Sequence, residues 1–140
     1  MTVKVESVNA NSKRTLTERE LMSGVKVVYP ALSRSEVVKR LRERSRELQK
    51  SLPLTRLILF GSYASNRFTA ASDIDVLVVY EDPERNGAYQ IVVRELLLPR
   101  LEPRVCTESQ YRALLRMSPK FATTLASDGI AILGEAKVNG

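Results

Sequence analysis

Two aspartates, Asp73 and Asp75, stand on either side of Ile74 at the start of a valine-rich run. Residues two apart in a β-strand point to the same face, so both carboxylates should project together while Ile74 faces the core. Two carboxylates this close repel each other unless a cation lies between them. An isolated Asp-x-Asp pair is more often the solvated face of an amphipathic strand, so the function of this pair depends on the residues around it.

A glycine–serine pair, Gly61 and Ser62, follows a compact apolar run and lies upstream of Ser72. Glycine allows the backbone to approach a phosphate closely. The amides that follow it, at the start of a short helix, would point at an anion, and the Ser62 hydroxyl is a further donor. Together with the aspartates, the pair predicts a phosphate site beside a cation site.

The chain has no histidine and a single cysteine, Cys106. The absence of histidine excludes a serine or cysteine nucleophile paired with an imidazole base, and also an imidazole-rich zinc site. A metal must then be held mainly by oxygen atoms, which favours Mg²⁺ or Mn²⁺. Cys106 cannot form an internal disulfide, which fits a reducing cytosol, and we interpret it as a small apolar strand residue.

The 140 residues are 44% hydrophobic and carry a formal net charge of +6. This length and composition suit one globular domain with a core. The positive charge favours anionic partners such as nucleotides, nucleic acid or acidic proteins, without choosing among them. No run approaches the roughly 20 apolar residues of a membrane helix, and the N-terminus lacks the apolar core of a signal peptide. We therefore expect a cytoplasmic protein that does not bind membranes.

Periodicity, capping pairs and breakers predict an alternation of helices and strands. This order indicates an α/β (α+β) domain with a small, mixed or antiparallel sheet flanked by helices. The expected elements are a helix from Ser33 up to the breaker Pro53, strands over Leu54–Phe60 and Ile74–Tyr80, a helix over Ala88–Leu98, a strand over Leu101–Cys106, helices from Thr107 to about Arg116 and over Phe121–Ser127 with Gly129 as its C-cap, and a short strand over Ile130–Leu133.

Three segments are expected along the chain. Residues 1–32 form an N-terminal extension whose apolar run, Val25–Tyr29, is either an extra edge strand or an extended lead-in. Residues 33–135 form the domain, and 136–140 a tail.

From Lys39 to Lys50 the first helix carries six positive and two negative charges. We interpret this as a solvated face with alternating charges in preference to a nucleic-acid-binding helix.

The segment Leu57–Asp82 resembles the minimal nucleotidyltransferase family of the polymerase-beta-like superfamily. The family pattern is Gly-Ser-x-Ala-x-Gly, five residues, then Ser-Asp-x-Asp. It is matched by Gly61, Ser62, Ala64, Ser72, Asp73 and Asp75. Asn66 stands where the family usually has glycine. Because asparagine tolerates a left-handed backbone better than most residues, the loop should be preserved. Ser65 replaces an arginine that is common in the family.

The resemblance implies a polymerase-beta-like fold and a third carboxylate on a later strand, for which Glu102 is the candidate. Its neighbour Pro103 lacks an N–H donor, so that strand should be an edge strand or should bulge. In the family's arrangement Asp73 and Asp75 would hold Mg²⁺, and Glu102 would bind the acceptor-side metal or take the acceptor's proton. Gly61 and Ser62 would cradle the terminal phosphates of the nucleotide, and Ser72 would cap the turn that presents Asp73.

The resemblance also implies an activity, the transfer of a nucleoside monophosphate from a triphosphate, here AMP from ATP, to an acceptor hydroxyl. Similar small domains are antitoxins that adenylylate a tyrosine of a HEPN-type toxin. An alternative is a catalytically inactive module that keeps the fold and binds a partner protein, with or without nucleotide. A third is an RNA-binding domain that uses the basic helix Lys39–Lys50. The sequence leaves the acceptor and the oligomeric state open.

Overall fold

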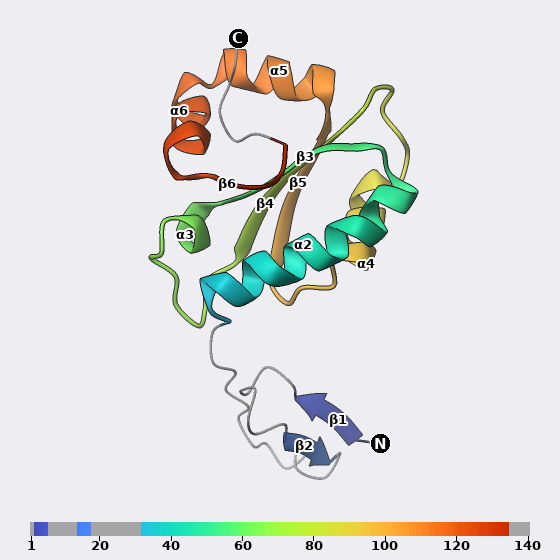
Figure 1. Ribbon diagram of the computed structural model, residues 1–140, viewed down its shortest axis with the longest axis vertical. Helices are drawn as coiled ribbons and strands as arrows, with labels where there is room; N and C mark the ends of the chain where they lie inside the picture. Colours follow the sequence, from blue (N-terminus) through green and yellow to red (C-terminus); the bar gives the residue numbers. More distant parts are fainter. Residues whose placement is uncertain (1, 6–13, 18–31, 135–140) are drawn as a thin grey trace. The chain divides into compact units, whose positions relative to one another are not determined.

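The computed structural model describes residues 2–5, 14–17 and 32–134 (Figure 1). The chain divides into two units, Met1–Leu32 with Thr69–Ala71, and Ser33–Phe68 with Ser72–Gly140. In the first unit, strands β1 (Thr2–Val5) and β2 (Arg14–Thr17) pair in antiparallel fashion. The strand considered at Val25–Tyr29 lies outside the described residues.

The second unit is built on a mixed four-stranded sheet with the order β5-β4-β3-β6. Strand β4 pairs with β3 in antiparallel fashion and with β5 in parallel, and β6 is antiparallel to β3. This confirms the expected small mixed sheet, and β3 and β4 have the predicted bounds. The strands are β3 (Leu54–Phe60), β4 (Ile74–Tyr80), β5 (Leu101–Thr107) and β6 (Ile130–Leu133).

Two capping boxes begin the helices on either side of the sheet, as predicted. The Ser33 hydroxyl accepts from the amide of Glu36, whose carboxylate accepts from the Ser33 amide, both at 3.1 Å. Thr107 and Gln110 form the same reciprocal pair. Each box satisfies donors that a helix start leaves unpaired. The helices are α2 (Arg34–Ser51), α3 (Gly61–Ala64), α4 (Ala88–Leu96), α5 (Glu108–Met117) and α6 (Pro119–Asp128).

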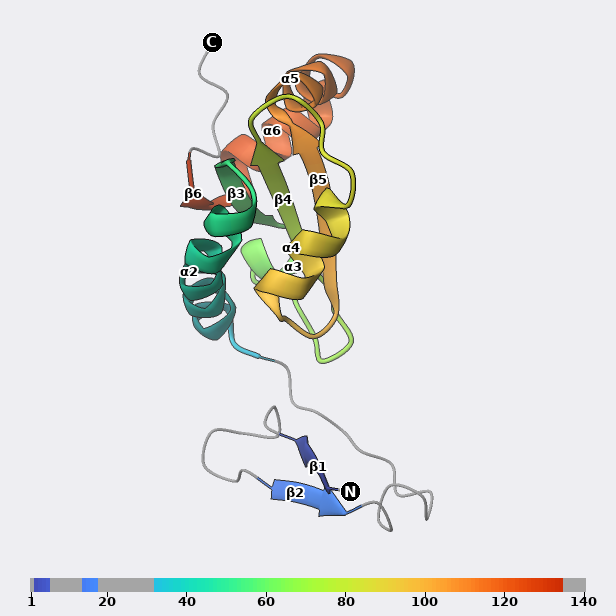
Figure 2. The ribbon, with the colours of Figure 1, turned by 90° about the vertical axis from the view of Figure 1, so that its right-hand side faces the viewer.

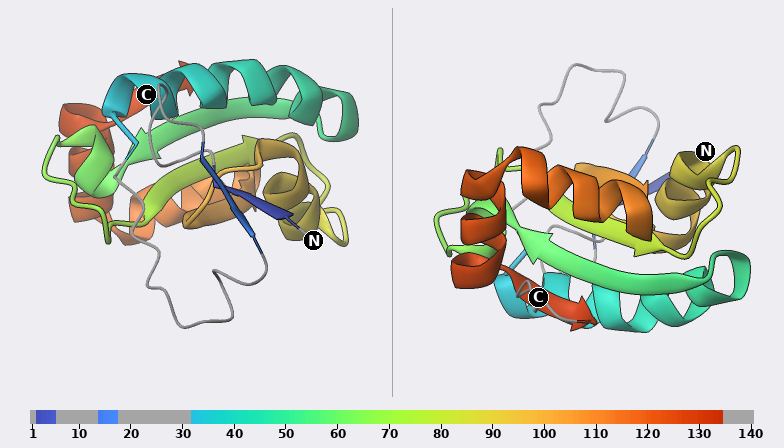
Figure 3. Two further views of the ribbon diagram at one scale, coloured as in Figure 1. Left: turned by 90° about the horizontal axis from the view of Figure 1, so that it is seen from below. Right: turned by 90° about the horizontal axis from the view of Figure 1, so that it is seen from above.

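Helices α2 and α4 cover one face of the sheet, and α5 and α6 lie against the other (Figure 2). Seen from above, α5 and α6 lie nearest the viewer, with the strands behind them (Figure 3, right). On the α5–α6 side, a buried cluster joins strand side chains to helix side chains. Its members are Ile58, Leu77, Val79, Tyr111 and Leu125.

The two helices of the other layer are held together by Arg44 of α2 and Glu95 of α4. The Arg44 Nε atom donates to the Glu95 carbonyl oxygen at 2.6 Å, and its Nη2 lies 3.4 Å from Glu95 Oε1. Leu41 and Leu96 are fully buried in these helices. No helix in the described part of the chain combines the length and apolarity needed to cross a membrane.

Candidate functional site

Asp73 and Asp75 flank a buried isoleucine at the start of β4. Ile74 is 2% exposed, the Asp73 side chain is half-exposed, and Asp75 is partly buried. Asp75 shares its strand face with Leu77 and Val79, two members of the buried cluster on the α5–α6 side. The two carboxylates are therefore placed at the end of the sheet where β4 begins.

The Asp75 carboxyl is partly buried and interacts with two other carboxylates. Burial raises its pKa above the ordinary value, and the charges of Asp73 and Glu102 raise it further, whereas Arg104 acts in the opposite direction. An elevated pKa from burial and like charges is typical of carboxylates that share a functional site. The three acidic residues singled out in the sequence therefore interact electrostatically in the fold.

Glu102 reaches this region because β5 runs parallel to β4. The ladder joins Ile74 to Leu101 and continues to the ends of both strands, and Glu102 is the Cα partner of Asp75. Pro103 lies on an edge strand, which is the position that proline tolerates in a sheet. Of the two geometries expected for this strand, the edge strand is correct, and the β4–β5 register has no shift.

Gly61 is required at its position by two features. Its φ is +75°, in the left-handed region that favours glycine. In addition, a Cβ atom at residue 61 would overlap Asp75 Oδ2 and would lie 3.0 Å from Asp75 Cγ. The sequence suggested a glycine that lets a phosphate approach, and did not reveal that this glycine also makes room for the Asp75 carboxylate.

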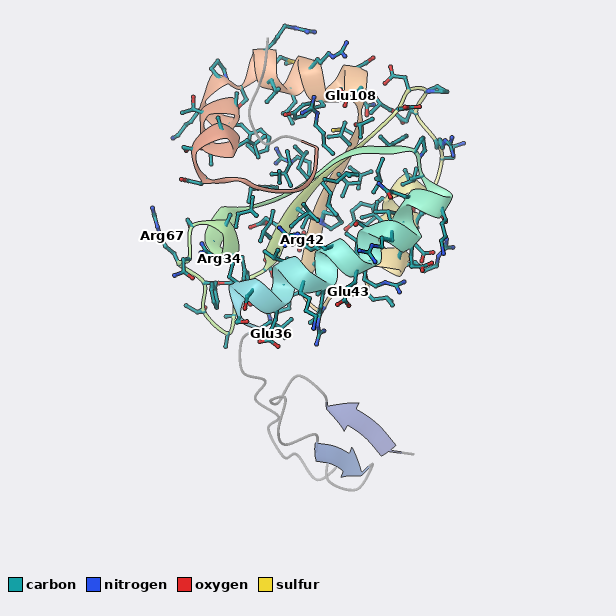
Figure 4. The ribbon with its side chains drawn as sticks, in the orientation of Figure 1. Arg34, Glu36, Arg42, Glu43, Arg67 and Glu108 are labelled. Carbon is teal, nitrogen blue, oxygen red and sulfur yellow. The ribbon has the colours of Figure 1, made fainter. Side chains whose placement is uncertain are left out.

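Helix α3 ends in a Schellman motif, in which two amides beyond the helix return to its carbonyl groups. The Asn66 amide donates to the Tyr63 carbonyl at 3.3 Å, and the Arg67 amide to the Ser62 carbonyl at 2.8 Å. Asn66 has φ +62°, so the expectation that asparagine would accept the left-handed position is confirmed. The Arg67 side chain extends outward from the loop (Figure 4).

Other side chains support this end of the sheet. Ser62 lies in α3 and Ser72 just before Asp73, and both are partly buried. Phosphate binding by Ser62 and capping of the turn by Ser72 stay predictions. Tyr63 is 3% exposed and stacks on Phe68 with ring centroids 4.2 Å apart, which makes it a core residue. Arg34 of α2 donates from Nη1 to the Ala64 carbonyl at 3.1 Å and so ties α2 to α3 (Figure 4).

Arg100 is a site residue that sequence reasoning missed. Its Nη2 lies 3.5 Å from Asp73 Oδ1, and its carbonyl oxygen accepts from the Ile74 amide at 2.8 Å. The guanidinium and the carbonyl group of Arg100 are positioned by the turn between α4 and β5, where Arg100 has φ +57°. No motif in the sequence marks this arginine, because its position depends on how the crossover returns to the sheet.

The oxygen-only donor set of Asp73, Asp75 and Glu102 suits Mg²⁺, which takes one or two carboxylates and completes its shell with water and phosphate oxygens. Within residues 2–5, 14–17 and 32–134, no three Asp, Glu, His or Cys side chains are grouped closely enough to hold one ion together. The residues therefore fit a metal bound by the two aspartates and a nucleotide better than a preformed three-carboxylate cage.

Cys106 has no features of a nucleophile. It is a free, partly buried thiol in β5, and burial raises its pKa to about 11. A thiol with so high a pKa is protonated at neutral pH and unreactive. The structure supports its interpretation as an apolar strand residue.

The raised pKa of Asp75 leads to a prediction about stability. Because the native state binds this proton more tightly than the unfolded state, ionised Asp75 costs stability at neutral pH, and the cost disappears as pH falls through the raised pKa. Asp75→Asn should therefore raise the melting temperature at pH 7 in metal-free buffer, and its advantage should shrink in acid. Thermal melts over a pH series measure this, with the exposed Asp128→Asn as control; a destabilised Asp75→Asn protein at pH 7 contradicts it.

A family model described as a nucleotidyltransferase domain matches residues 38–125, and the chain belongs to this family. A putative protein adenylyltransferase of Methanocaldococcus jannaschii is 41% identical over 49 residues, which are 35% of this chain and 50% of that protein. The chain thus matches about half the length of this curated relative. The motif resemblance to nucleotidyltransferases is confirmed at the level of the family.

Two solved structures illustrate the likeness, both with TM-scores below 0.5. A putative nucleotidyltransferase from Sulfolobus solfataricus has a TM-score of 0.49 and 20% identity, over 70% of this chain and 80% of that chain. An MNT antitoxin in complex with the tri-AMPylated HEPN toxin of Shewanella oneidensis has a TM-score of 0.46 and 17% identity, over 72% of both chains. At these scores the likeness carries no inference about activity.

Proposed function

We propose that this domain transfers AMP from ATP to an acceptor hydroxyl and releases pyrophosphate. The observation that carries the proposal is the Asp75 carboxyl, whose pKa is raised by burial and by the charges of Asp73 and Glu102. Asp75 lies directly against Gly61 of the Gly-Ser turn. Both residues lie within the region that the nucleotidyltransferase family model matches. Carboxylates next to a glycine turn suit the binding of a nucleoside triphosphate together with a divalent cation.

Each residue has a defined part in this reaction. The acceptor oxygen attacks the α-phosphorus, the bond from that phosphorus to the bridging oxygen of the β-phosphate breaks, and the electron pair leaves with pyrophosphate. Glu102 accepts the proton of the acceptor hydroxyl. Gly61 and Ser62 bind the terminal phosphates through backbone amides and a hydroxyl, and Arg100 orients Asp73 through their ion pair.

Asp73 and Asp75 would hold Mg²⁺, or Mn²⁺ in its place. The cation, when bound, would neutralise charge that develops on the phosphoryl oxygens and the leaving pyrophosphate. Between the two aspartates it would also relieve the like-charge repulsion that raises the pKa of Asp75.

For the acceptor, we propose a tyrosine hydroxyl on a HEPN-type partner protein, which makes this chain the antitoxin of a toxin–antitoxin pair. The resemblance of the Gly61–Asp75 motif to the minimal nucleotidyltransferases supports this choice. It also agrees with the name of the curated relative, a putative protein adenylyltransferase.

Labelled ATP tests the transfer. Incubation of the full chain with Mg²⁺ and a HEPN-type protein encoded by the adjacent gene should label that protein from [α-³²P]ATP but not from [γ-³²P]ATP. Label from the γ position would indicate phosphoryl transfer and would contradict the proposal. EDTA should abolish the reaction.

Nucleotide binding should depend on the metal and on Asp73. Calorimetry should show that Mg²⁺ or Mn²⁺, but not Zn²⁺, strengthens ATP binding, and that Asp73→Asn removes this gain. The melting temperature of Asp73→Asn should stay nearly unchanged, because its half-exposed ion pair with Arg100 is worth at most about 1 kcal/mol. The control is Glu81→Gln, just beyond the opposite end of β4. Equal ATP affinity in Mg²⁺ and in EDTA would argue against the site.

A second candidate function, an inactive module that binds a partner protein, is favoured by two observations. The three carboxylates do not form a close metal-holding group among the described residues, and Asp73 is already paired with Arg100. Binding to the partner without transfer of label, in the presence of Mg²⁺ and ATP, would select this alternative.

A further inference from the structure

Helix α4 and the residue that caps it carry exposed apolar side chains. Tyr89, Val93 and Leu97 are 48%, 41% and 63% exposed and follow one another at intervals of four residues. Tyr89 and Val93 lie on the same side of α4, and Leu97 is the C-cap residue just beyond the helix, at φ +51°. We name these three residues the α4 stripe. The helix already packs on the sheet through a separate face of buried residues, Ala88, Val92 and Leu96.

The charges at the two ends of α4 have opposite signs. Residues 81–87, before the helix, hold three acidic side chains and one basic side chain, all exposed. At the other end, Arg94 and Arg100 have side chains that are 65% and 53% exposed. Glu95, the acidic residue between them, is largely buried and bound to Arg44 and Arg94. The α4 stripe therefore lies between an acidic and a basic end.

We propose that the α4 stripe is the contact surface for a second copy of this chain, docked antiparallel across a two-fold axis at Val93. In this arrangement Val93 meets its own counterpart, and Tyr89 of each copy lies toward the Leu97 cap of the other, because positions 89 and 97 are equally far from position 93 in the sequence. The acidic start of each helix then faces the basic end of the other. A two-fold interface must be self-complementary in this way.

The proposed dimer is weak, and the inference does not rest on the proposed transfer reaction. A patch on one nine-residue helix lies at the small end of specific interfaces, so we expect a dissociation constant of roughly 10–100 µM. The stripe nevertheless ends beside the candidate site. The turn that follows Leu97 contains Arg100, which bonds to Asp73 and to the Ile74 amide.

Sedimentation of the full chain over a concentration series tests the association. The wild-type protein should pass from monomer to dimer between about 1 and 500 µM, given an interface of this size. Val93→Glu should remain monomeric, because two like charges would meet at the axis. Met117→Glu is the matched control, since Met117 is an apolar residue that is 84% exposed on another helix, and it should dimerise like the wild type.

A cross-link tests the arrangement. In a Cys106→Ser background, Val93→Cys should form a reducible disulfide dimer on mild oxidation, whereas Met117→Cys should not. Melting temperatures close to the wild type show that each variant is folded. A monomer at every concentration, a dimer insensitive to Val93→Glu, or association without the position-93 cross-link would each overturn the proposal. The first of these results, combined with binding of another protein to α4, would identify a heterologous partner surface.

Discussion

Glu102→Gln is expected to lower the rate of nucleotidyl transfer by roughly 10²–10⁴-fold, the loss typical of removing a positioned proton acceptor. Glutamine keeps the size of the side chain but cannot take the acceptor's proton. ATP binding in Mg²⁺ should stay largely intact, because in the proposed arrangement Asp73 and Asp75 would hold the nucleotide metal. Glu102 lies beside Asp75 in the parallel ladder, where its charge already raises the pKa of that carboxyl.

Single-turnover transfer and calorimetry of ATP binding separate the two effects of the glutamine substitution. Glu43→Gln on α2 removes one exposed carboxylate elsewhere and should change neither measurement. Full transfer activity in Glu102→Gln would remove this glutamate from the mechanism. Loss of ATP affinity equal to that of Asp73→Asn would instead make Glu102 a ligand of the nucleotide metal.

The largest effect on stability is expected from Gly61→Ala. Two costs add at this position, about 1–2 kcal/mol for a non-glycine residue at φ +75° and about 1–3 kcal/mol for the overlap of the new Cβ with Asp75. Because the Asp75 carboxylate must move, Mg²⁺-dependent ATP binding should weaken as well, even where the domain remains folded.

Gly87→Ala is a control that isolates the backbone cost. Gly87 has φ +79°, and the nearest atom to an added Cβ there is Gln90 Oε1 at 4.0 Å, so only the left-handed conformation is penalised. Denaturant unfolding should show a loss for Gly61→Ala that exceeds the loss for Gly87→Ala. Asp75→Ala in the Gly61→Ala background should recover part of the difference, as a double-mutant cycle would show. Equal losses at the two glycines would rule out the close contact with Asp75.

The elements predicted with correct bounds were those with strong local signals. Strands β3 and β4 are apolar runs bounded by turn residues, and the capping boxes at Ser33 and Thr107 require only residues three positions apart. Helix α4 ends at Leu96, two residues earlier than predicted, because Leu97 turns into the left-handed region. A leucine at φ +51° has no sequence signature, so this boundary could not be found from local patterns.

The sequence identified Gly129 and Gly61 as turn residues, and the structure shows a further reason for glycine at each position. Gly129 does cap α6, but its backbone is extended, with φ −65°, and not left-handed. Glycine is needed there because a Cβ would lie 2.5 Å from the Leu125 carbonyl oxygen and 3.1 Å from Ile58. Such crowding depends on tertiary packing, as does the contact of Gly61 with Asp75. The acidic pair was visible in the sequence, whereas the space around it was not.

The proline in β5 has a consequence for the behaviour of the protein in concentrated solution. An edge strand offers unpaired backbone groups to the strands of other molecules and is a common starting point for aggregation. Strand β5 is such an edge, and it has Pro103 in its interior between the exposed side chains of Glu102 and Arg104. Proline lacks the donor that an added strand would need, and the flanking charges would be costly to bury. The strand that brings Glu102 to Asp75 is thus also protected against the growth of intermolecular sheets.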